Sequence, residues 1–360
     1  MGADATPAAA AAAPERPAAP LVDLPRLEAW LETLLPGGGP ARLARLGEAT
    51  GIANALFALD WGGRTLVLRR APAARITSSA GNTLREATLL GALADTPVRH
   101  PPLVATCPDP DVIGARFILM ERVDGFTPTG DLPAPFDRAP EVRRALGVEA
   151  VDALAELASV DWRAAGLDGF GRPDGFLDRQ VDRWLWQLGT YQTRPLPDAT
   201  DVLAPWLRAH QPATGPIAIM HGDYSLFNVM FAHDAPARLA AIVDWDTATI
   251  GDPLLDLGHL LARWDEPGEP PTFLGSSDIA DRTGLATRAQ LAARYADRTS
   301  LDLADLRFYE VLSLFKLGCI LEGHHAQAPR AGDPAGGQFA PMAPAVFADA
   351  AAIARGERTL

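Results

Sequence analysis

The segment HGDYSLFN, residues 221–228, combines a carboxylate and an amide at the spacing of a kinase catalytic loop, H-x-D-x-x-x-x-N. A carboxylate in such a loop accepts a hydrogen bond from an acceptor hydroxyl and acts as catalytic base or as an orienting group. An amide oxygen is a hard ligand that suits Mg²⁺. The segment therefore predicts Asp223 as the catalytic residue and Asn228 as a metal ligand.

A second acidic motif, IVDWD at residues 242–246, ends an apolar, strand-like run. A carboxylate at such a place chelates Mg²⁺ between nucleotide phosphates. Asp244 and Asp246 are two residues apart, so in an extended strand their side chains would face the same side. We therefore expect Asp244 to bind the metal, and Asp246 either to bind a second metal ion or to orient Asp244.

Three longer segments make the chain similar to a known family: HGDYSLFNVMF, IVDWDTATIGDPLLDLGHLL and GFGRPDGFLDRQVDRW. Over roughly residues 40–330 the chain resembles the aminoglycoside phosphotransferase-like family of small-molecule kinases. The third segment resembles the branch with kinase domains fused to acyl-CoA dehydrogenases. The resemblance implies an α+β, two-lobed, protein-kinase-like fold with a small strand-rich N-lobe and a large, mostly helical C-lobe. It also implies ATP or GTP as co-substrate, Mg²⁺ as cofactor and a small-molecule hydroxyl group as acceptor.

The phosphate anchor is expected in the run LVLR, where most kinases carry V-A-I-K. The cation here is Arg69, and its natural ion-pair partner is Glu86 from the following predicted helix; a solvated Arg–Glu pair is the alternative. Arginine is planar and bidentate rather than a compact ammonium, so it does not automatically replace lysine. The sequence predicts that Arg69 and Glu86 hold the nucleotide phosphates.

Two further segments are expected to contact the nucleotide. Residues 47–54 contain Gly51 and precede a strand-like run, as a glycine-containing loop over phosphates would. Residues 120–123, which include Met120, Glu121 and Val123, are expected to meet the adenine edge, because a base is held there by main-chain groups and apolar walls.

Several polar residues near these motifs are interpreted as scaffold. His221 is expected to tie the catalytic loop to neighbouring backbone. Asp252 and Asp256, in the motif GDPLLDLG, either share a helix face near the metal or act as turn and cap residues, which we favour. His259 is expected to be packed rather than catalytic, and Lys316 either faces a ligand or extends to solvent.

The chain of 360 residues carries a net charge of −13, from 45 acidic and 32 basic residues. This excess of acids argues against a general nucleic-acid binder, which needs a basic face. No run of 18 apolar residues is present, so no membrane span is predicted. Cys107 and Cys319 are far apart and in no metal-ligand spacing, which indicates reduced thiols and a cytoplasmic protein.

The chain divides into three predicted parts. Residues 1–20 form an Ala/Pro-rich tail of disordered composition. Residues 21–123 contain strand-like runs and form the N-lobe, which covers the nucleotide. Residues 124–360 are mostly helical and form the C-lobe, which holds the catalytic motifs and the acceptor. The segment near residue 124 is the expected hinge.

The acceptor is left open between an antibiotic, a hydroxyacyl thioester and an amino alcohol, and ATP is not distinguished from GTP. A polycationic aminoglycoside needs a ring of carboxylates, whereas an acyl compound needs apolar walls. The C-lobe offers both, and we favour a neutral or anionic hydroxyl compound with a sizeable apolar part. The acids are Asp265, Glu266, Glu269, Glu310 and Glu322, and the aromatic residues are Trp184, Trp186, Trp264, Phe308 and Tyr309.

Three other functions fit parts of the pattern. An aminoglycoside antibiotic-resistance kinase would carry the same motifs. A catalytically weak nucleotide-binding regulator would fit the replacement of lysine by Arg69 and the sparse glycine loop, but not the complete set of Asp223, Asn228 and Asp244. A protein kinase is disfavoured, because nothing between Asp244 and residue 300 looks like an activation segment that closes on A-P-E.

Overall fold

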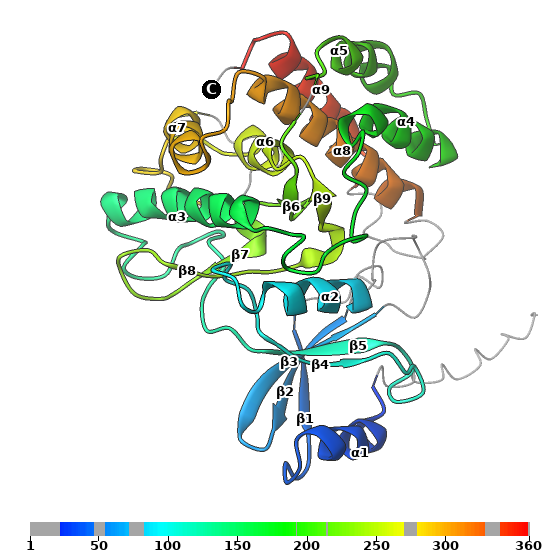
Figure 1. The fold of residues 1–360 in the computed structure, drawn as a ribbon. Helices are drawn as coiled ribbons and strands as arrows, with labels where there is room; N and C mark the ends of the chain where they lie inside the picture. Colours follow the sequence, from blue (N-terminus) through cyan, green and yellow to red (C-terminus); the bar gives the residue numbers. More distant parts are fainter. Residues whose placement is uncertain are drawn as a thin grey trace, which may run out of the picture.

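The computed structural model describes residues 22–46, 55–71, 83–191, 193–213, 215–269, 279–327 and 339–358. These residues form a two-lobed, protein-kinase-like α+β fold, with a five-stranded sheet in one lobe and mostly helices in the larger one (Figure 1). The fold class implied by the resemblance is therefore confirmed. The lobe boundaries at residues 123 and 124 stay a prediction, and residues 1–20 lie outside the described ranges.

The N-lobe is built on an antiparallel sheet in the order β1-β2-β3-β5-β4. β2 and β3 form the hairpin that the sequence predicts. Gly62 and Gly63 close it with φ angles of 58° and 77°, which glycine adopts without strain. The strands are β1 (Arg42–Leu46), β2 (Ala55–Trp61), β3 (Arg64–Arg70), β4 (Leu103–Cys107) and β5 (Phe117–Glu121).

The C-lobe core forms around α8, which packs against α6 and α9 and is buried along most of its length. In the N-lobe, α2 lies between the sheet and the C-lobe, whereas α1 lies at the far end of the sheet (Figure 1). The apolar spacing predicts most of these helices, but not α6 and α9. The helices are α1 (Leu24–Leu34), α2 (Thr83–Leu93), α3 (Pro140–Ser159), α4 (Gln180–Tyr191), α5 (Ala204–Ala209), α6 (Leu254–Ala262), α7 (Arg288–Thr299), α8 (Leu306–Gln327) and α9 (Met342–Ala354).

Alternation along β3 sends its two neighbouring arginines to opposite faces of the sheet. Leu66 and Leu68 pack in the core that includes α1, and Arg70 lies on their face, where its guanidinium donates to backbone carbonyls. Val67 and Arg69 lie on the other face, toward α2 and the C-lobe. Arg69 is therefore the arginine that faces the other lobe.

Two short antiparallel strand pairs carry the sequence motifs of the C-lobe. In the second pair Val229 lies opposite Ile242, and the backbone N–H of Val243 donates to the carbonyl of Asn228 at 2.9 Å. This register places the end of the catalytic loop beside the start of the acidic motif. The pairs are β6 (Ala218–Met220) with β9 (Thr249–Gly251), and β7 (Val229–Phe231) with β8 (Leu239–Ile242).

The two cysteines are buried in different lobes, Cys107 on β4 and Cys319 on α8, and are not joined in a disulfide. Burial raises the pKa of both thiols, which keeps them protonated. None of the helices in the described part of the chain has the length and apolar composition needed to cross a membrane.

Candidate active site

A cavity of about 460 Å³ lies between the N-lobe sheet and the β7–β8 pair, a size typical of small-molecule sites. The predicted phosphate anchor, the predicted base-binding segment and two predicted metal ligands all line it. Gly51, the predicted loop glycine, lies outside the described residues. The predicted residues that line the cavity are Arg69, Glu86, Met120, Glu121, Val123, Asn228 and Asp244.

The predicted base-binding segment, residues 120–123, includes the last two residues of β5. The backbone N–H of Glu121 donates to the carbonyl of Pro102 at 2.9 Å, which fixes the end of β5. Leu56, Val67 and Met120 supply apolar surface to the cavity nearby. Main-chain groups beside apolar walls are what a purine base requires.

Arg69 is buried, with 5% of its surface exposed, among three carboxylates that we call the acidic cluster: Glu86, Asp244 and Asp246. Its Nε lies 2.8 Å from Glu86 Oε2. Its Nη2 lies 2.7 Å from Asp244 Oδ1 and 2.7 Å from Asp246 Oδ2. Burial alone would lower the pKa of the guanidinium, but the acidic cluster raises it above its ordinary value, so Arg69 stays charged. The predicted Arg69–Glu86 pair is thus a buried one.

The acidic cluster carries more negative charge than Arg69 neutralises. Three carboxylates meet one guanidinium, so two negative charges remain when all three are ionised. Burial raises the pKa of Glu86 above its ordinary value, and the charge of Arg69 opposes that rise. Asp244 is the most open of the three, with 49% of its side chain exposed. Asp244 is therefore the carboxylate of the cluster that is most accessible to a divalent cation arriving with nucleotide phosphates.

Asp244 has a φ angle of 66°, in the left-handed region, two residues after β8 ends. Asp tolerates this region better than most residues other than glycine. The reversal leads into a 3₁₀ helix, Trp245–Thr247, instead of continuing the strand. The expectation that Asp244 and Asp246 share a face of an extended strand is therefore wrong, although both reach Arg69.

The carboxylate of Asp223 is held from two sides. His259 Nε2 lies 3.0 Å from Oδ1, and Asn228 Nδ2 donates to Oδ2 at 3.1 Å. Burial alone would raise the pKa of Asp223, but the hydrogen bond from the imidazole and two nearby cations hold it well below its usual range. The two cations are Lys316 and Arg263. The Asp223 carboxylate is thus ionised and held in one orientation, so it can accept a hydrogen bond from an alcohol.

Asn228 uses its amide nitrogen for Asp223, donating also to the Asp223 carbonyl at 2.9 Å. A side-chain amide has one nitrogen that donates and one oxygen that accepts. The amide oxygen is therefore the atom of Asn228 that remains for a hard cation, as predicted for a metal ligand.

The catalytic loop is tied down by the residues interpreted as scaffold. His221 Nε2 donates to the carbonyl of Val243 at 2.9 Å. Asp256 accepts from the backbone N–H groups of His221 and Gly222, at 2.6 and 2.8 Å. Gly222 has a φ angle of 83°, and a Cβ there would lie 2.5 Å from the carbonyl oxygen of Thr247, so the position requires glycine. These contacts are the ones that a scaffold role demands.

The five acids considered for a cationic acceptor form ion pairs within the C-lobe or are buried in it. Three of the five form ion pairs with arginines, and the other two are buried. None of the five therefore contributes to an open ring of carboxylates. The pairs are Glu266 and Glu269 with Arg288, and Glu322 with Arg194, and the buried acids are Asp265 and Glu310.

Four of the five aromatic residues considered as acceptor walls belong to the C-lobe core instead. Trp186, on α4, is the exception, with 73% of its surface exposed. The apolar part of an acceptor would therefore have to contact residues other than these four buried aromatic side chains. The four core residues are Trp184, Trp264, Phe308 and Tyr309.

The sequence did not reveal the groups that surround Asp223. Lys316 on α8 donates through Nζ to the carbonyl of Gly222, so it faces the catalytic loop and not bulk solvent. His259 is buried as expected, but it also contacts Asp223. An available signal was the motif DPLLDLGHLLAR: in one helix, Asp256, His259 and Arg263 follow at i, i+3 and i+7 and share a face.

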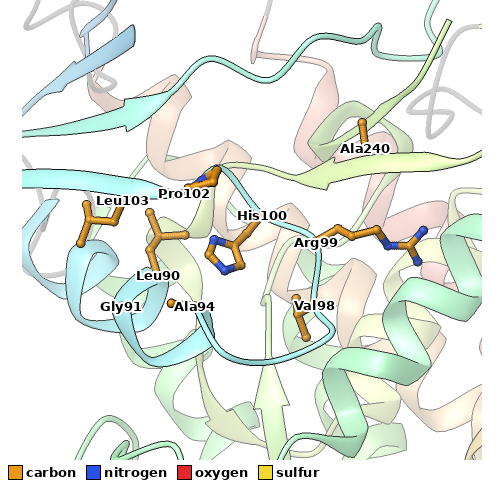
Figure 2. A pocket seen from close by; sticks show the side chains of 9 residues that line it. All are labelled: Leu90, Gly91, Ala94, Val98, Arg99, His100, Pro102, Leu103 and Ala240. Atoms are coloured by element: carbon orange, nitrogen blue, oxygen red, sulfur yellow. The ribbon is translucent and has the colours of Figure 1, made fainter.

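A second cavity, of about 400 Å³, lies beside the end of α2 and the start of β4 and holds none of the predicted site residues (Figure 2). In Figure 2, Arg99 extends away from the other labelled residues, and it pairs with Glu149 and Glu156 of α3. The remaining lining is mostly apolar and includes none of the motif carboxylates or amides, so the first cavity is the candidate site. The other lining residues are Leu90, Gly91, Ala94, Val98, His100, Pro102, Leu103 and Ala240.

Known proteins share this sequence pattern. The model of the phosphotransferase enzyme family matches residues 49–308. Acyl-CoA dehydrogenase family member 11 of Rattus norvegicus is 32% identical over 318 residues, and that of Mus musculus is 34% identical over 311 residues. The matches cover 85% and 84% of this chain but 39% of each relative. The chain thus spans about two fifths of the length of these curated relatives.

Solved structures also share the fold. One from Ralstonia eutropha JMP134, described as a candidate aminoglycoside phosphotransferase, is 30% identical with a TM-score of 0.77 and covers 93% of this chain and 99% of that chain. Another is a thermostable mutant of the aminoglycoside phosphotransferase APH(4)-Ia in a ternary complex with ADP and hygromycin B. It is 16% identical with a TM-score of 0.57 and covers 92% of this chain and 99% of that chain, a likeness of fold alone.

Proposed function

Because the chain belongs to the phosphotransferase enzyme family, we propose that it transfers the γ-phosphate of ATP, or of GTP, to a hydroxyl group of a small molecule with Mg²⁺ as cofactor. The observation that carries this proposal is a single cavity lined by the phosphate anchor, the base-binding segment and the acidic motif. Phosphoryl transfer depends on positioning and charge neutralisation more than on covalent chemistry, and this cavity provides groups for both.

The nucleotide is proposed to bind with its base along residues 120–123 and its phosphates toward Arg69. Asn228 and Asp244 would hold Mg²⁺, which neutralises phosphate charge when bound, and Asp246 would hold a second ion or orient Asp244. Arg69 keeps the acidic cluster together from a buried position, with Glu86 on α2 holding the guanidinium. These contacts support the proposal, because they hold Asp244 at the edge of the nucleotide cavity.

Asp223 is proposed to receive the acceptor. The acceptor hydroxyl donates to the Asp223 carboxylate, and its oxygen attacks the γ-phosphorus. The bond from that phosphorus to the β,γ-bridging oxygen breaks, and the hydroxyl proton passes to Asp223 as the new P–O bond forms. The products are the phosphorylated acceptor and a nucleoside diphosphate.

The proposed acceptor is a neutral or anionic hydroxyl compound with a sizeable apolar part, such as a hydroxyacyl thioester. The five C-lobe acids considered for a cationic acceptor are paired or buried, so these five do not offer a ready ring of carboxylates to the ammonium groups of an aminoglycoside. The charged side chains that act on Asp223 are the cations Lys316 and Arg263. The name of the relatives, acyl-CoA dehydrogenase family member 11, also supports an acyl compound.

Transfer assays with two acceptor classes test the proposed function and acceptor together. With ATP or GTP and Mg²⁺, hydroxyacyl thioesters should be phosphorylated with kcat/KM above about 10⁴ M⁻¹s⁻¹, the low end of ordinary enzymes. Kanamycin-type aminoglycosides should react far more slowly. Efficient aminoglycoside phosphorylation would overturn the acceptor class and leave phosphoryl transfer standing. Nucleotide binding without transfer to any acceptor would favour a nucleotide-binding regulator instead.

Replacement of the proposed base tests the transfer step itself. Asp223→Asn keeps the shape of the side chain but cannot take a proton, so kcat should fall by about 10²- to 10⁴-fold. The KM for nucleotide should stay near the wild-type value, because Asp223 does not line the nucleotide cavity. A variant with wild-type kcat would show that Asp223 is not the base.

A further inference from the structure

His259 contacts the proposed catalytic carboxylate directly. It lies on α6 with 3% of its surface exposed, and its Nε2 is 3.0 Å from Asp223 Oδ1. The other carboxylate oxygen, Oδ2, accepts from Asn228 Nδ2 at 3.1 Å. Each oxygen of Asp223 therefore has one donor, and the two donors come from different segments of the fold.

The surroundings of His259 select one tautomer of its ring. Burial lowers the pKa of His259 to about 4, so the ring is neutral near pH 7 and carries a single N–H. A carboxylate oxygen only accepts hydrogen bonds, so the contact with Asp223 requires the hydrogen on Nε2. Nδ1 is buried without a hydrogen-bond partner among the described residues, so a hydrogen there would be an unsatisfied donor. Arg263 Nη1 lies 3.1 Å from the same Nε2. Because Nε2 carries the hydrogen in this tautomer, it cannot accept from Arg263, which contributes only its charge near the ring.

The helix that carries His259 is fixed to the catalytic loop. Asp256, three residues earlier on α6, accepts from two backbone N–H groups of that loop at 2.6 and 2.8 Å. Asp252, just before α6, accepts from the hydroxyl of Tyr309 at 2.7 Å. Residues three apart on a helix share a face, so Asp256 and His259 both face the loop. The imidazole is therefore presented to Asp223 from a rigid element.

We propose that His259 is a positioning residue, whose Nε2–H holds the Asp223 carboxylate in the orientation that receives the acceptor hydroxyl. This inference rests on the proposed function. Asn228 alone would leave the carboxylate free to turn about a single hydrogen bond, and a displacement of about 1 Å at a reacting group costs about 10²-fold in rate. Lys316 acts differently, since it donates to the backbone carbonyl of Gly222 and so fixes the loop and not the carboxylate.

Three substitutions separate the N–H of His259 from its volume. His259→Gln places an amide N–H at the reach of Nε2. His259→Asn carries the same amide but is too short to reach Asp223, and His259→Leu fills the space without a polar atom. We expect His259→Asn and His259→Leu to lower kcat by about 10- to 100-fold, with the KM for nucleotide within about threefold of wild type. His259→Gln should restore kcat to within about fivefold of wild type.

The comparison among the variants decides the positioning role. Thermal unfolding of all four proteins shows whether a lost kcat reflects a lost fold, and His259→Gln and His259→Asn are similar in polarity, which makes them a matched pair. A kcat of His259→Gln as low as that of His259→Leu, in folded protein, overturns the role. So does a change confined to the KM for nucleotide.

A measurement that needs no acceptor separates this inference from the proposed function. A long-range ¹H–¹⁵N spectrum of the imidazole rings, assigned with the His259→Gln variant, reports which nitrogen carries the hydrogen. A protonated Nε2 supports the contact with Asp223, and a protonated Nδ1 overturns it. Failure of the wild-type protein to transfer phosphate to any acceptor overturns the proposed function and the catalytic role of the contact, while the spectrum still decides the contact itself.

Discussion

The two halves of the candidate site have different balances of charge. In the half next to the N-lobe, the single cation Arg69 meets the three carboxylates of the acidic cluster. In the catalytic loop, the carboxylate of Asp223 lies near two cations, Lys316 and Arg263, and the buried carboxylate of Asp256 accepts from the backbone of the same loop. The first half therefore has more negative than positive charges, whereas in the second two cations stand beside two carboxylates.

This difference matches what each half is proposed to bind. Negative charge that Arg69 does not neutralise favours a divalent cation, which brings the nucleotide phosphates with it. The two cations near Asp223 keep its carboxylate ionised, as the proposed hydrogen bond from an acceptor hydroxyl requires. The excess of negative charge is thus confined to the half that is proposed to bind the metal.

The largest effect is expected from removing the most open carboxylate of the acidic cluster. Asp244→Ala should abolish measurable turnover while the fold survives, because Mg²⁺ loses its carboxylate ligand. Asp244→Asn is the control for backbone strain, since Asn tolerates the φ angle of 66° found here, and it should be about as inactive. Rates at increasing Mg²⁺ concentration, with circular dichroism for the fold, test this. If Asp244→Ala reacts at the wild-type rate with saturating MgATP, Asp244 is not a ligand of the metal.

A smaller loss is expected from the cation of the same half. Arg69→Ala should lower kcat/KM by about 10- to 1,000-fold, or about 1.4 kcal/mol for each tenfold. Arg69→Lys should keep part of the activity, because one ammonium cannot span the acidic cluster as a planar guanidinium does. Arg70→Lys is the matched control on the opposite face of β3, and its KM for nucleotide should equal that of the wild type. If Arg69→Lys and Arg70→Lys lose equal activity, the loss comes from a disturbed β-sheet and not from the site.

The smallest effect concerns the attachment of α6, which holds His259 against Asp223. Burial raises the pKa of Asp252 to about 6 from its ordinary value of 3.8. Between these values the folded protein keeps a proton that the unfolded chain has lost, so the contribution of Asp252 to stability falls as pH rises through this window.

Asp252→Asn does not titrate and keeps an oxygen acceptor for Tyr309. Its free energy of unfolding relative to wild type should therefore improve by about 2 to 3 kcal/mol between pH 4 and pH 7, at about 1.4 kcal/mol for each unit of pKa shift. Chemical denaturation at the two pH values measures this difference. A difference that does not change with pH would show that Asp252 titrates normally.

Both motifs of the C-lobe could be located from the sequence because their residues are close together in the chain. The loop HGDYSLFN lies between β6 and β7, and the acidic motif follows β8, so local spacing already fixes which residues stand at the strand ends. The hairpin of β2 and β3 was predictable for the same reason, since alternation and a Gly-Gly turn are local signals.

The helix α6 has only a weak periodic signal in the sequence. All nine of its residues, Leu254–Ala262, are buried and seven of them are apolar or glycine, so the polar mark of a helical repeat within it is limited to Asp256 and His259, three residues apart. The contact of His259 with Asp223 depends on that helix and was missed with it. The interpretation of His259 as a packed residue correctly predicted its burial but did not predict its contact with Asp223.

By itself, the sequence determined the chemical types at the site: a carboxylate and an amide in one loop, two acids after a strand, and an arginine where a lysine is usual. Only the tertiary structure decided how these charges balance. Arg69 and Asp244 are 175 residues apart in the chain and 2.7 Å apart in the fold. The register of β7 with β8 and the burial of α6 and α8 set such distances. Hydrogen bonds and Coulomb energies depend on separation in space, which spacing along the chain does not encode.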